Sequence, residues 1–203
     1  MKKAVLVLVT CWISVPALAQ FAGLPIAGPA TVGEGGATWV SAGAVIGDDF
    51  NLYGGRLSFS PIGRLSLFAD AGAIDPDDGD LGLSFQGGVQ FTLPMKESPV
   101  DVAARATWGH AGFDVKGGDV KMSGFNIGAL LSRDLESFSP YVFLGLNFVD
   151  SEVKAGGAKH TDDATDLAAA FGALLRLGHQ FALYGEIAHV DELFFSVGLR
   201  RVF

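Results

Sequence analysis

The sequence predicts an all-β fold, a single closed antiparallel transmembrane β-barrel of ten strands, with eight strands as the alternative. Three observations predict it. Segments of about ten residues that alternate between apolar and polar side chains recur from Ala37 to Phe203, separated by turn residues. Hydrophobic residues make up 49% of the chain, yet beyond the N-terminus no stretch reaches the roughly 18 consecutive apolar residues of a membrane helix. The N-terminus itself resembles an export signal.

The first 19 residues contain the three parts of a secretory signal peptide. Lys2 and Lys3 form a positive start, residues 4–13 an apolar core, and Ala17-Leu18-Ala19 a small-residue cleavage site before Gln20. Cleavage there shortens the 203-residue chain by 19 and leaves 184 residues. That length is enough for one domain.

The charge and cysteine content of the mature chain limit its chemistry. Its only cysteine, Cys11, lies in the signal, so we expect no disulfide and no reactive thiol. A lipoprotein signal ending at Cys11 is the alternative, but its apolar core would be very short. Removing Lys2 and Lys3 from 14 Lys and Arg leaves 12 against 22 Asp and Glu, a net charge of −10. This charge argues against a nucleic-acid partner, and no cofactor is expected.

The chain after the signal divides into a lead-in and a repeating part. Residues 20–36 are rich in Gly, Ala and Pro without alternation, which predicts an irregular periplasmic lead-in. The expected strands are 37–47, 51–60, 64–74, 81–93, 100–112, 121–132, 140–149, 167–178, 181–190 and 193–203. Segment 81–93 shows the alternation best, because its apolar side chains share one face while Gly, Ser, Gln and Thr occupy the other. In a barrel, the apolar face contacts lipid and the polar face lines the lumen.

The connections between these segments alternate in character. One set is short or contains proline: 61–63, 94–99, 133–139 and 179–180. The other set is acidic: 47–50, 75–80, 113–120, 150–166 and 191–192. Short periplasmic turns and longer exterior loops are typical of outer-membrane barrels.

The alternation, the asymmetry of the connections and the terminal Phe203 together make residues 37–203 resemble small bacterial outer-membrane β-barrels of the opacity and OmpA-like porin group. The resemblance implies location in the outer membrane, contact with its lipids and lipopolysaccharide, and recognition of Phe203 by the outer-membrane assembly machinery. In that group the residue two before the terminal Phe is usually apolar or aromatic, whereas here it is Arg201. We expect its charge to extend to the periplasmic headgroups.

Strand parity places a small set of charged residues in the lumen. These are Arg56, Asp70, Arg105, Arg176, Glu186 and Arg200. The favoured interpretation is a structural ionic network, because narrow barrels fill their interiors with side chains and buried charges need partners. Glu186 is expected to bridge Arg176 or Arg200, which lie on the two flanking strands. A gate or selectivity filter is the functional alternative.

Loop 75–80 carries closely spaced carboxylates around a glycine, at Asp75, Asp77, Asp78 and Asp80. Such oxygen ligands suit calcium, but the position where a calcium-binding loop of the EF-hand type has Glu is occupied by Gln86. The sequence favours a solvated turn, with weak divalent-cation bridging to lipopolysaccharide phosphates as the alternative.

The four histidines provide the test for enzymatic barrels. His110 and His189 are expected near the outer rim. Lipid A deacylases use a Ser and a His on the lipid-facing surface, and omptin proteases use His and acidic residues at the outer rim. No serine is predicted beside either residue, since Ser196 points into the lumen by parity. His160 falls in the longest acidic loop and His179 in a periplasmic turn. A rim histidine without a positioned nucleophile argues against catalysis.

The sequence therefore predicts a non-enzymatic barrel that reinforces the envelope or presents acidic loops to a surface ligand of unspecified identity. A narrow channel for ions or small solutes is the first alternative. A lipid-modifying or proteolytic enzyme that uses His110 or His189 is the second. Few lumen charges and many Gly and Ala argue against a wide hydrated pore, which needs more strands.

Overall fold

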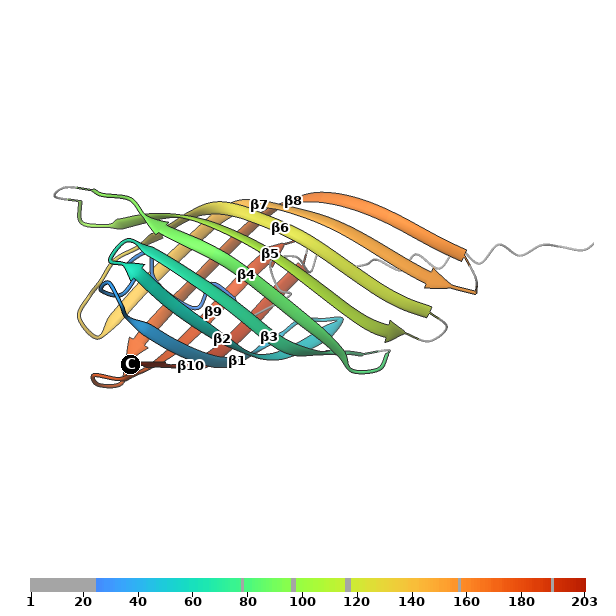
Figure 1. Ribbon diagram of the computed structural model, residues 1–203, viewed down its shortest axis with the longest axis horizontal. Helices are drawn as coiled ribbons and strands as arrows, with labels where there is room; N and C mark the ends of the chain where they lie inside the picture. Colours follow the sequence, from blue (N-terminus) through green and yellow to red (C-terminus); the bar gives the residue numbers. More distant parts are fainter. Residues whose placement is uncertain (1–24, 78, 96–97, 116–117, 157, 191) are drawn as a thin grey trace, which may run out of the picture.

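The computed structural model describes residues 25–77, 79–95, 98–115, 118–156, 158–190 and 192–203. The expected signal peptide lies outside these ranges. The described residues form one closed antiparallel barrel in which each strand pairs with its sequence neighbours and β1 pairs with β10 (Figure 1). The strands are β1 Thr38–Ile46, β2 Phe50–Ile62, β3 Leu65–Pro76, β4 Gly82–Thr92, β5 Asp101–Val115, β6 Gly118–Ser132, β7 Phe138–Ala155, β8 Ala158–Arg176, β9 Phe181–Val190 and β10 Glu192–Val202. Ten strands and the all-β fold class are thereby confirmed.

The alternation of side chains separates the outer surface from the lumen. Along β9, every second residue is buried and the others are exposed, over the full length of the strand. Leu144 on β7 is 52% exposed on the outer surface, whereas Asn147 on the same strand is fully buried inside. The other outward positions in this band are also apolar, including Leu83, Phe91 and Phe148. Within the described ranges, no helix is long and apolar enough to cross a membrane.

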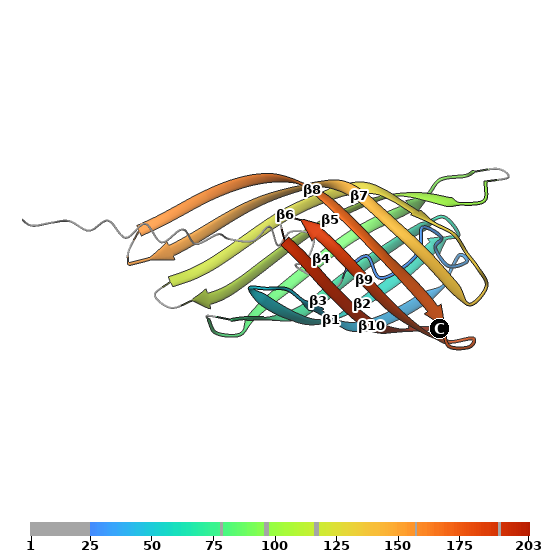
Figure 2. The same cartoon turned by 180° about the vertical axis from the view of Figure 1, so that it is seen from behind.

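The barrel has two unlike ends. One end, which we call the turn end, contains the C-terminus and the short connections; the opposite end is the loop end. At the loop end, strands β5 to β8 extend well beyond their neighbours (Figures 1 and 2). The prediction of loops at 113–120 and 150–166 was therefore wrong over most of both segments, because pairing continues to Val115↔Gly118 and to Ala155↔Ala158. Residues in this extension face water on both sides of β8, so the apolar–polar alternation that predicts a membrane strand is missing there.

Large aromatic side chains fill the lumen by lying across glycines of neighbouring strands. The ring of Tyr184 on β9 occupies the space where side chains at Gly43 and Gly198 would begin. Tyr141 on β7 likewise lies over Gly172 on β8. Both tyrosines are almost completely buried. The glycines are therefore required for close approach of the ring to the backbone, and the rings in turn cover backbone that glycine leaves open.

Of the predicted lead-in 20–36, residues 20–24 lie outside the described residues. Residues 25–36 form no strand, and residues 25–30 are buried inside the barrel, whereas a periplasmic position was expected. Ile26, Ala27 and Ala30 are buried among lumen-facing side chains. We call residues 25–33 the inner segment. A segment of small and apolar residues fits a narrow lumen whose remaining space is taken by wall side chains.

Candidate functional site

The inner wall contains a buried ion pair between β2 and β3. Arg56 Nε and Nη2 donate to the two carboxylate oxygens of Asp70, each at 2.7 Å. The two residues are direct cross-strand partners, so the pairing of the strands places the guanidinium group opposite the carboxylate. Gln86 Nε2 on β4 also donates to Asp70, at 3.1 Å. Two parallel bonds to a carboxylate are the strongest geometry for such a pair.

Glu186 has different partners from those predicted. Its carboxylate accepts a hydrogen bond from Tyr141 Oη at 2.9 Å and from the backbone N–H groups of Ile26 and Ala27 at 3.3 and 3.2 Å. It forms no ion pair with an arginine among the described residues. Its charge is held by the inner segment, about 160 residues away in sequence. No side-chain pattern could reveal this partner, because the donors are backbone groups.

Arg176, predicted to face Glu186, lies instead at the turn end. Its guanidinium donates to both carboxylate oxygens of Asp134, at 2.7 and 2.8 Å, and also contacts the Glu136 carbonyl. Asp134 belongs to the turn between β6 and β7 and is largely exposed. The hydrogen bond from Arg176 lowers the pKa of the Asp134 carboxyl below its usual value. Strand parity predicts nothing about a turn residue such as Asp134, so this pair was not predicted from the sequence.

The two remaining arginines have no carboxylate partner in the described part of the chain. Arg105 on β5 donates to Gln90 Oε1 at 3.4 Å and lies over the ring of Phe68, 4.2 Å from its centroid. Arg200 on β10 donates to the carbonyl of Ala27 and lies 5.7 Å from the centroid of the Trp39 ring. Both side chains contact the region of the inner segment.

Further hydrogen bonds fix the backbone of the inner segment to the wall. Arg56 Nη1 donates to the Ile26 carbonyl at 3.0 Å. Thr92 Oγ1 donates to the Ala30 carbonyl at 2.6 Å, and the Ala30 N–H donates to Ser132 Oγ at 2.9 Å. The segment is thus held from several strands around the lumen, which satisfies backbone groups that no secondary structure pairs.

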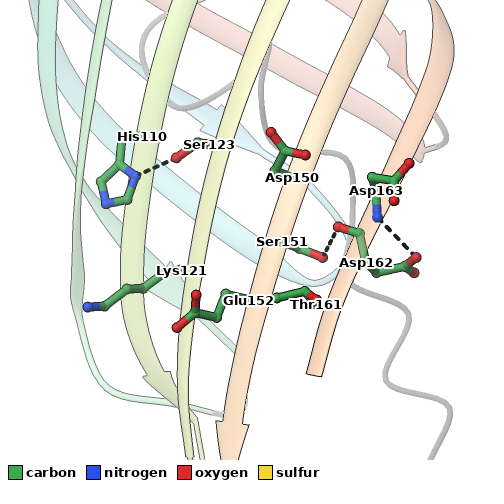
Figure 3. Close-up of a pocket in the computed structure, with 9 residues that line it drawn as sticks. All are labelled: His110, Lys121, Ser123, Asp150, Ser151, Glu152, Thr161, Asp162 and Asp163. Atoms are coloured by element: carbon green, nitrogen blue, oxygen red, sulfur yellow. Dashed lines mark hydrogen bonds between the residues drawn. The ribbon is translucent and has the colours of Figure 1, made fainter. Parts of the chain in front are cut away.

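A second candidate site is an open cavity of about 420 Å³ on the outer surface of the β5–β8 extension (Figure 3). It is lined by His110, Lys121, Ser123, Asp150, Ser151, Glu152, Thr161, Asp162 and Asp163. One cross-strand row of the sheet supplies four of these residues, in the order His110, Ser123, Asp150 and Asp163. The cavity is therefore lined by polar groups, four of which are carboxylates.

An aromatic row lies beside this cavity, on its turn-end side. Trp108, Phe125 and Phe148 are cross-strand partners, one step nearer the turn end on the same outward face. All three are exposed, and the rings of Phe125 and Phe148 stack with centroids 6.4 Å apart. Aromatic girdles of this kind lie at the headgroup level of barrels. The polar row of the cavity, from His110 to Asp163, follows directly on the loop-end side of these rings.

The cavity corrects the prediction that no serine lies beside His110. His110 Nδ1 and Ser123 Oγ are 2.8 Å apart. The register of the β5–β6 hairpin aligns them, so a correct prediction of its turn would have found the pair. Asp150, however, lies on the far side of Ser123 from His110 (Figure 3). In the described cavity no carboxylate orients the imidazole, as hydrolysis by a serine–histidine pair requires.

The other three histidines have different neighbours. His189 pairs with Ala169 and Leu193, with no serine opposite. His160, predicted in a loop, lies in β8 opposite Val153. His179 lies in the turn between β8 and β9, as predicted.

The acidic loop 75–80 gives no metal centre in the described residues. No group of three or more His, Cys, Asp or Glu side chains there, or elsewhere in the described ranges, is arranged to hold a metal ion. Asp78 lies outside the described residues. The loop instead joins the β5 extension, because the Asp80 N–H donates to the Asp114 carbonyl at 2.8 Å.

The C-terminal residue completes the turn end of the barrel. The Phe203 N–H donates to the Thr38 carbonyl at 2.9 Å. The Arg201 guanidinium lies over the rings of Phe203 and Phe181, 4.7 and 5.7 Å from their centroids. The charge at this unusual position is thus placed between two aromatic rings at the barrel edge.

Comparison with known proteins agrees with this architecture. The family described as outer membrane protein beta-barrel domain matches residues 6–194. The chain belongs to this family. It is a bacterial outer-membrane β-barrel protein, so the turn end faces the periplasm and the loop end the exterior. Among curated proteins, no relative matches the chain.

Solved structures resemble the barrel at low sequence identity. The N-terminal barrel of OprF from Pseudomonas aeruginosa is 11% identical with a TM-score of 0.46, over 84% of this chain and 100% of that one. Ail, the attachment invasion locus protein of Yersinia pestis, is 12% identical with a TM-score of 0.42, over 84% and 100%. An outer membrane channel from Pseudomonas putida F1 is 13% identical with a TM-score of 0.47, over 87% and 98%.

Proposed function

We propose that this protein is a non-enzymatic, closed barrel that reinforces the outer membrane and presents the β5–β8 extension at the cell surface. The observation that supports the closed state is the inner segment, which occupies the lumen and is bonded to several strands. Side chains of the wall fill much of the remaining space, because Tyr141 and Tyr184 lie across it. A narrow barrel filled in this way leaves no wide path for solutes.

The proposed surface role rests on the charge of the extension. Its outer face contains Asp150, Glu152 and Asp163, with Lys121 as the basic group beside them. Because these residues lie directly beyond an aromatic row, and such rows in barrels lie at the headgroup level, lipopolysaccharide is the proposed neighbour. An acidic surface repels its phosphates, so contact through sugar hydroxyls or through divalent cations shared with the phosphates is favoured. Recognition of Phe203 by the assembly machinery is proposed for the C-terminal strand.

Conductance in a planar bilayer tests the closed state. Inserted mature protein is expected to give no resting current under conditions in which an open porin control conducts. A stable current from the unmodified protein would contradict the proposal and favour the channel alternative.

A specific observation supports that alternative. Polar side chains line the lumen beyond the inner segment, and buried atoms of Ser84, Thr107, Asn126 and Asn147 have no hydrogen-bond partner among the described protein groups. Such groups in barrels are usually hydrated. A channel would therefore use this polar side of the lumen, after displacement of the inner segment.

The enzymatic alternative rests on the contact between His110 and Ser123. Purified protein is expected to release no fatty acid from lipid A and no fragment from a peptide substrate. Hydrolysis that disappears in Ser123→Ala would contradict the non-enzymatic role.

A further inference from the structure

A small cavity lies between the inner segment and the wall, at the level of the lumen arginines. Its volume is about 20 Å³. Roughly 10–15 Å³ is enough for one water-sized particle, so the cavity accommodates a single small species. Among its lining residues are Arg56, Arg105 and Arg200, together with the hydroxyl-bearing Ser58 and Ser66. Three guanidinium groups around one such space are unusual, since like charges at close range repel.

In this layer of the lumen, at the level of the cavity, the carboxylates do not pair one to one with the three arginines. Asp70 is bonded twice by Arg56 and once by Gln86. Glu186 is bonded by Tyr141 and by backbone N–H groups of the inner segment. In the described part of this layer, three arginines therefore face two carboxylates, which leaves an excess of one positive charge.

The unbalanced charge is concentrated on Arg105 and Arg200. Among the described residues, Arg105 forms one hydrogen bond, a long one to a neutral amide, and its guanidinium also lies over the ring of Phe68. Arg200 Nε is buried and has no hydrogen-bond partner in the described residues. A buried donor without a partner, on a charged group, costs substantial free energy. A negatively charged species in the cavity, which Arg200 lines, would balance its charge.

We infer that this cavity binds one small monovalent anion, such as chloride, which joins the inner segment to the barrel wall. One negative charge matches the excess of one positive charge, and a monatomic anion is only slightly larger than a water molecule. The inference does not depend on the proposed function, because either a closed barrel or a gated channel could hold this ion.

Anion-dependent stability tests the site. The mature protein, folded in detergent, is heated in sodium chloride, sodium bromide and sodium gluconate at equal ionic strength. Chloride and bromide are expected to raise the unfolding midpoint, on the order of 5 °C at concentrations about 100-fold above Kd. Gluconate, which is too large for the cavity, is expected to give no such rise. Equal midpoints in all three salts would overturn the inference.

Substitutions locate the effect. Arg105→Gln is expected to lose the difference between chloride and gluconate, whereas Arg176→Gln, at the periplasmic rim, is expected to retain it. Retention of the full difference in Arg105→Gln would place the ion elsewhere and overturn the site. If Arg105→Gln does not fold, crystals of the unmodified protein grown in bromide decide the question. An anomalous peak is expected within contact distance of Arg105 and Arg200, and its absence would refute the proposal.

Discussion

At the scale of single residues, each charge in the barrel is stabilised in a way set by its location. The Arg56–Asp70 pair is buried and bidentate, whereas the Arg176–Asp134 pair has similar bond lengths but is largely open to solvent. Burial removes the water that would otherwise solvate an unpaired charge. The two pairs therefore allow a direct comparison of how burial changes the cost of losing one partner.

Asp70→Asn is expected to lower the free energy of unfolding by about 3–5 kcal/mol, because it leaves Arg56 charged and buried without a full ionic partner. Asp134→Asn, the matched control, should cost about 1 kcal/mol or less at its exposed site. Denaturant unfolding of the detergent-folded proteins measures both. Similar losses for the two variants would show that burial does not distinguish these pairs.

The lipid-facing residue Leu144 tests the register. Leu144→Arg places a charge at the middle of the apolar band and is expected to cost about 2–4 kcal/mol of insertion free energy. Thr161→Arg, also exposed but above the aromatic row, is the control and should insert almost normally. Refolding yield into vesicles at increasing urea gives the comparison. Equal tolerance at the two positions would mean that the outward face or the membrane boundary is assigned wrongly.

At the scale of elements, the strands depend on close contacts between aromatic rings and glycines. Gly172→Ala would place a methyl group within the ring of Tyr141, whose hydroxyl also holds Glu186. We expect a destabilisation of about 1–3 kcal/mol from overpacking. Gly156→Ala is not a suitable control, because that residue has a positive φ of 57°. Gly112→Ala, with only an ordinary contact 3.8 Å away, should change the thermal midpoint much less, and a similar effect of both would contradict the packing argument.

The β7–β8 extension contains exposed ion pairs on the loop-end side of the aromatic row. Glu152 contacts Lys154 at 2.9 Å and Lys159 at 2.6 Å, and hydrogen bonds from both lower the pKa of the Glu152 carboxyl to about 2. A folded pKa below the usual 4.5 means that this interaction contributes fully above about pH 4.5. It is lost as the pH falls toward 2.

An NMR titration of the Glu152 carboxyl tests this pH range. We expect a midpoint clearly below 4.5 in the unmodified protein, which rises toward the usual value in Lys159→Met. A midpoint near 4.5 in the unmodified protein, or a midpoint that Lys159→Met does not change, would show that the two lysines do not bind the carboxylate in solution.

At the scale of the whole molecule, the inner segment decides whether the lumen is closed. A variant that lacks residues 25–33 but retains the barrel strands is expected to fold with lower stability, because Glu186 and Arg56 lose partners. It should conduct small ions, and anions in preference to cations, because Arg56, Arg105 and Arg200 face the opened space. Reversal potentials in a salt gradient measure the preference. A folded variant that remains closed would show that the wall side chains alone block the lumen.

The sequence by itself determined the barrel and the outward face of residues such as Leu144 and Phe148, whereas the choice of ten strands over eight was made only by the closed pairing of the structure. These features follow from a period of two, which is a local property of each segment and repeats along the chain. The signal peptide, outside the described residues, stays a prediction. Strand ends at the exterior were predicted less well, because water on both faces of β8 removes the alternation.

Only the tertiary structure decided the partners of the buried groups. The contact of His110 with Ser123 depends on hairpin register, and a shift of one residue would turn one side chain to the opposite face. The position of the inner segment and the bonds from Ile26 and Ala27 to Glu186 depend on closure of the whole barrel around a segment that has no periodic pattern. Such contacts join residues about 160 positions apart, so local sequence contains no signal for them until the strands between them are paired.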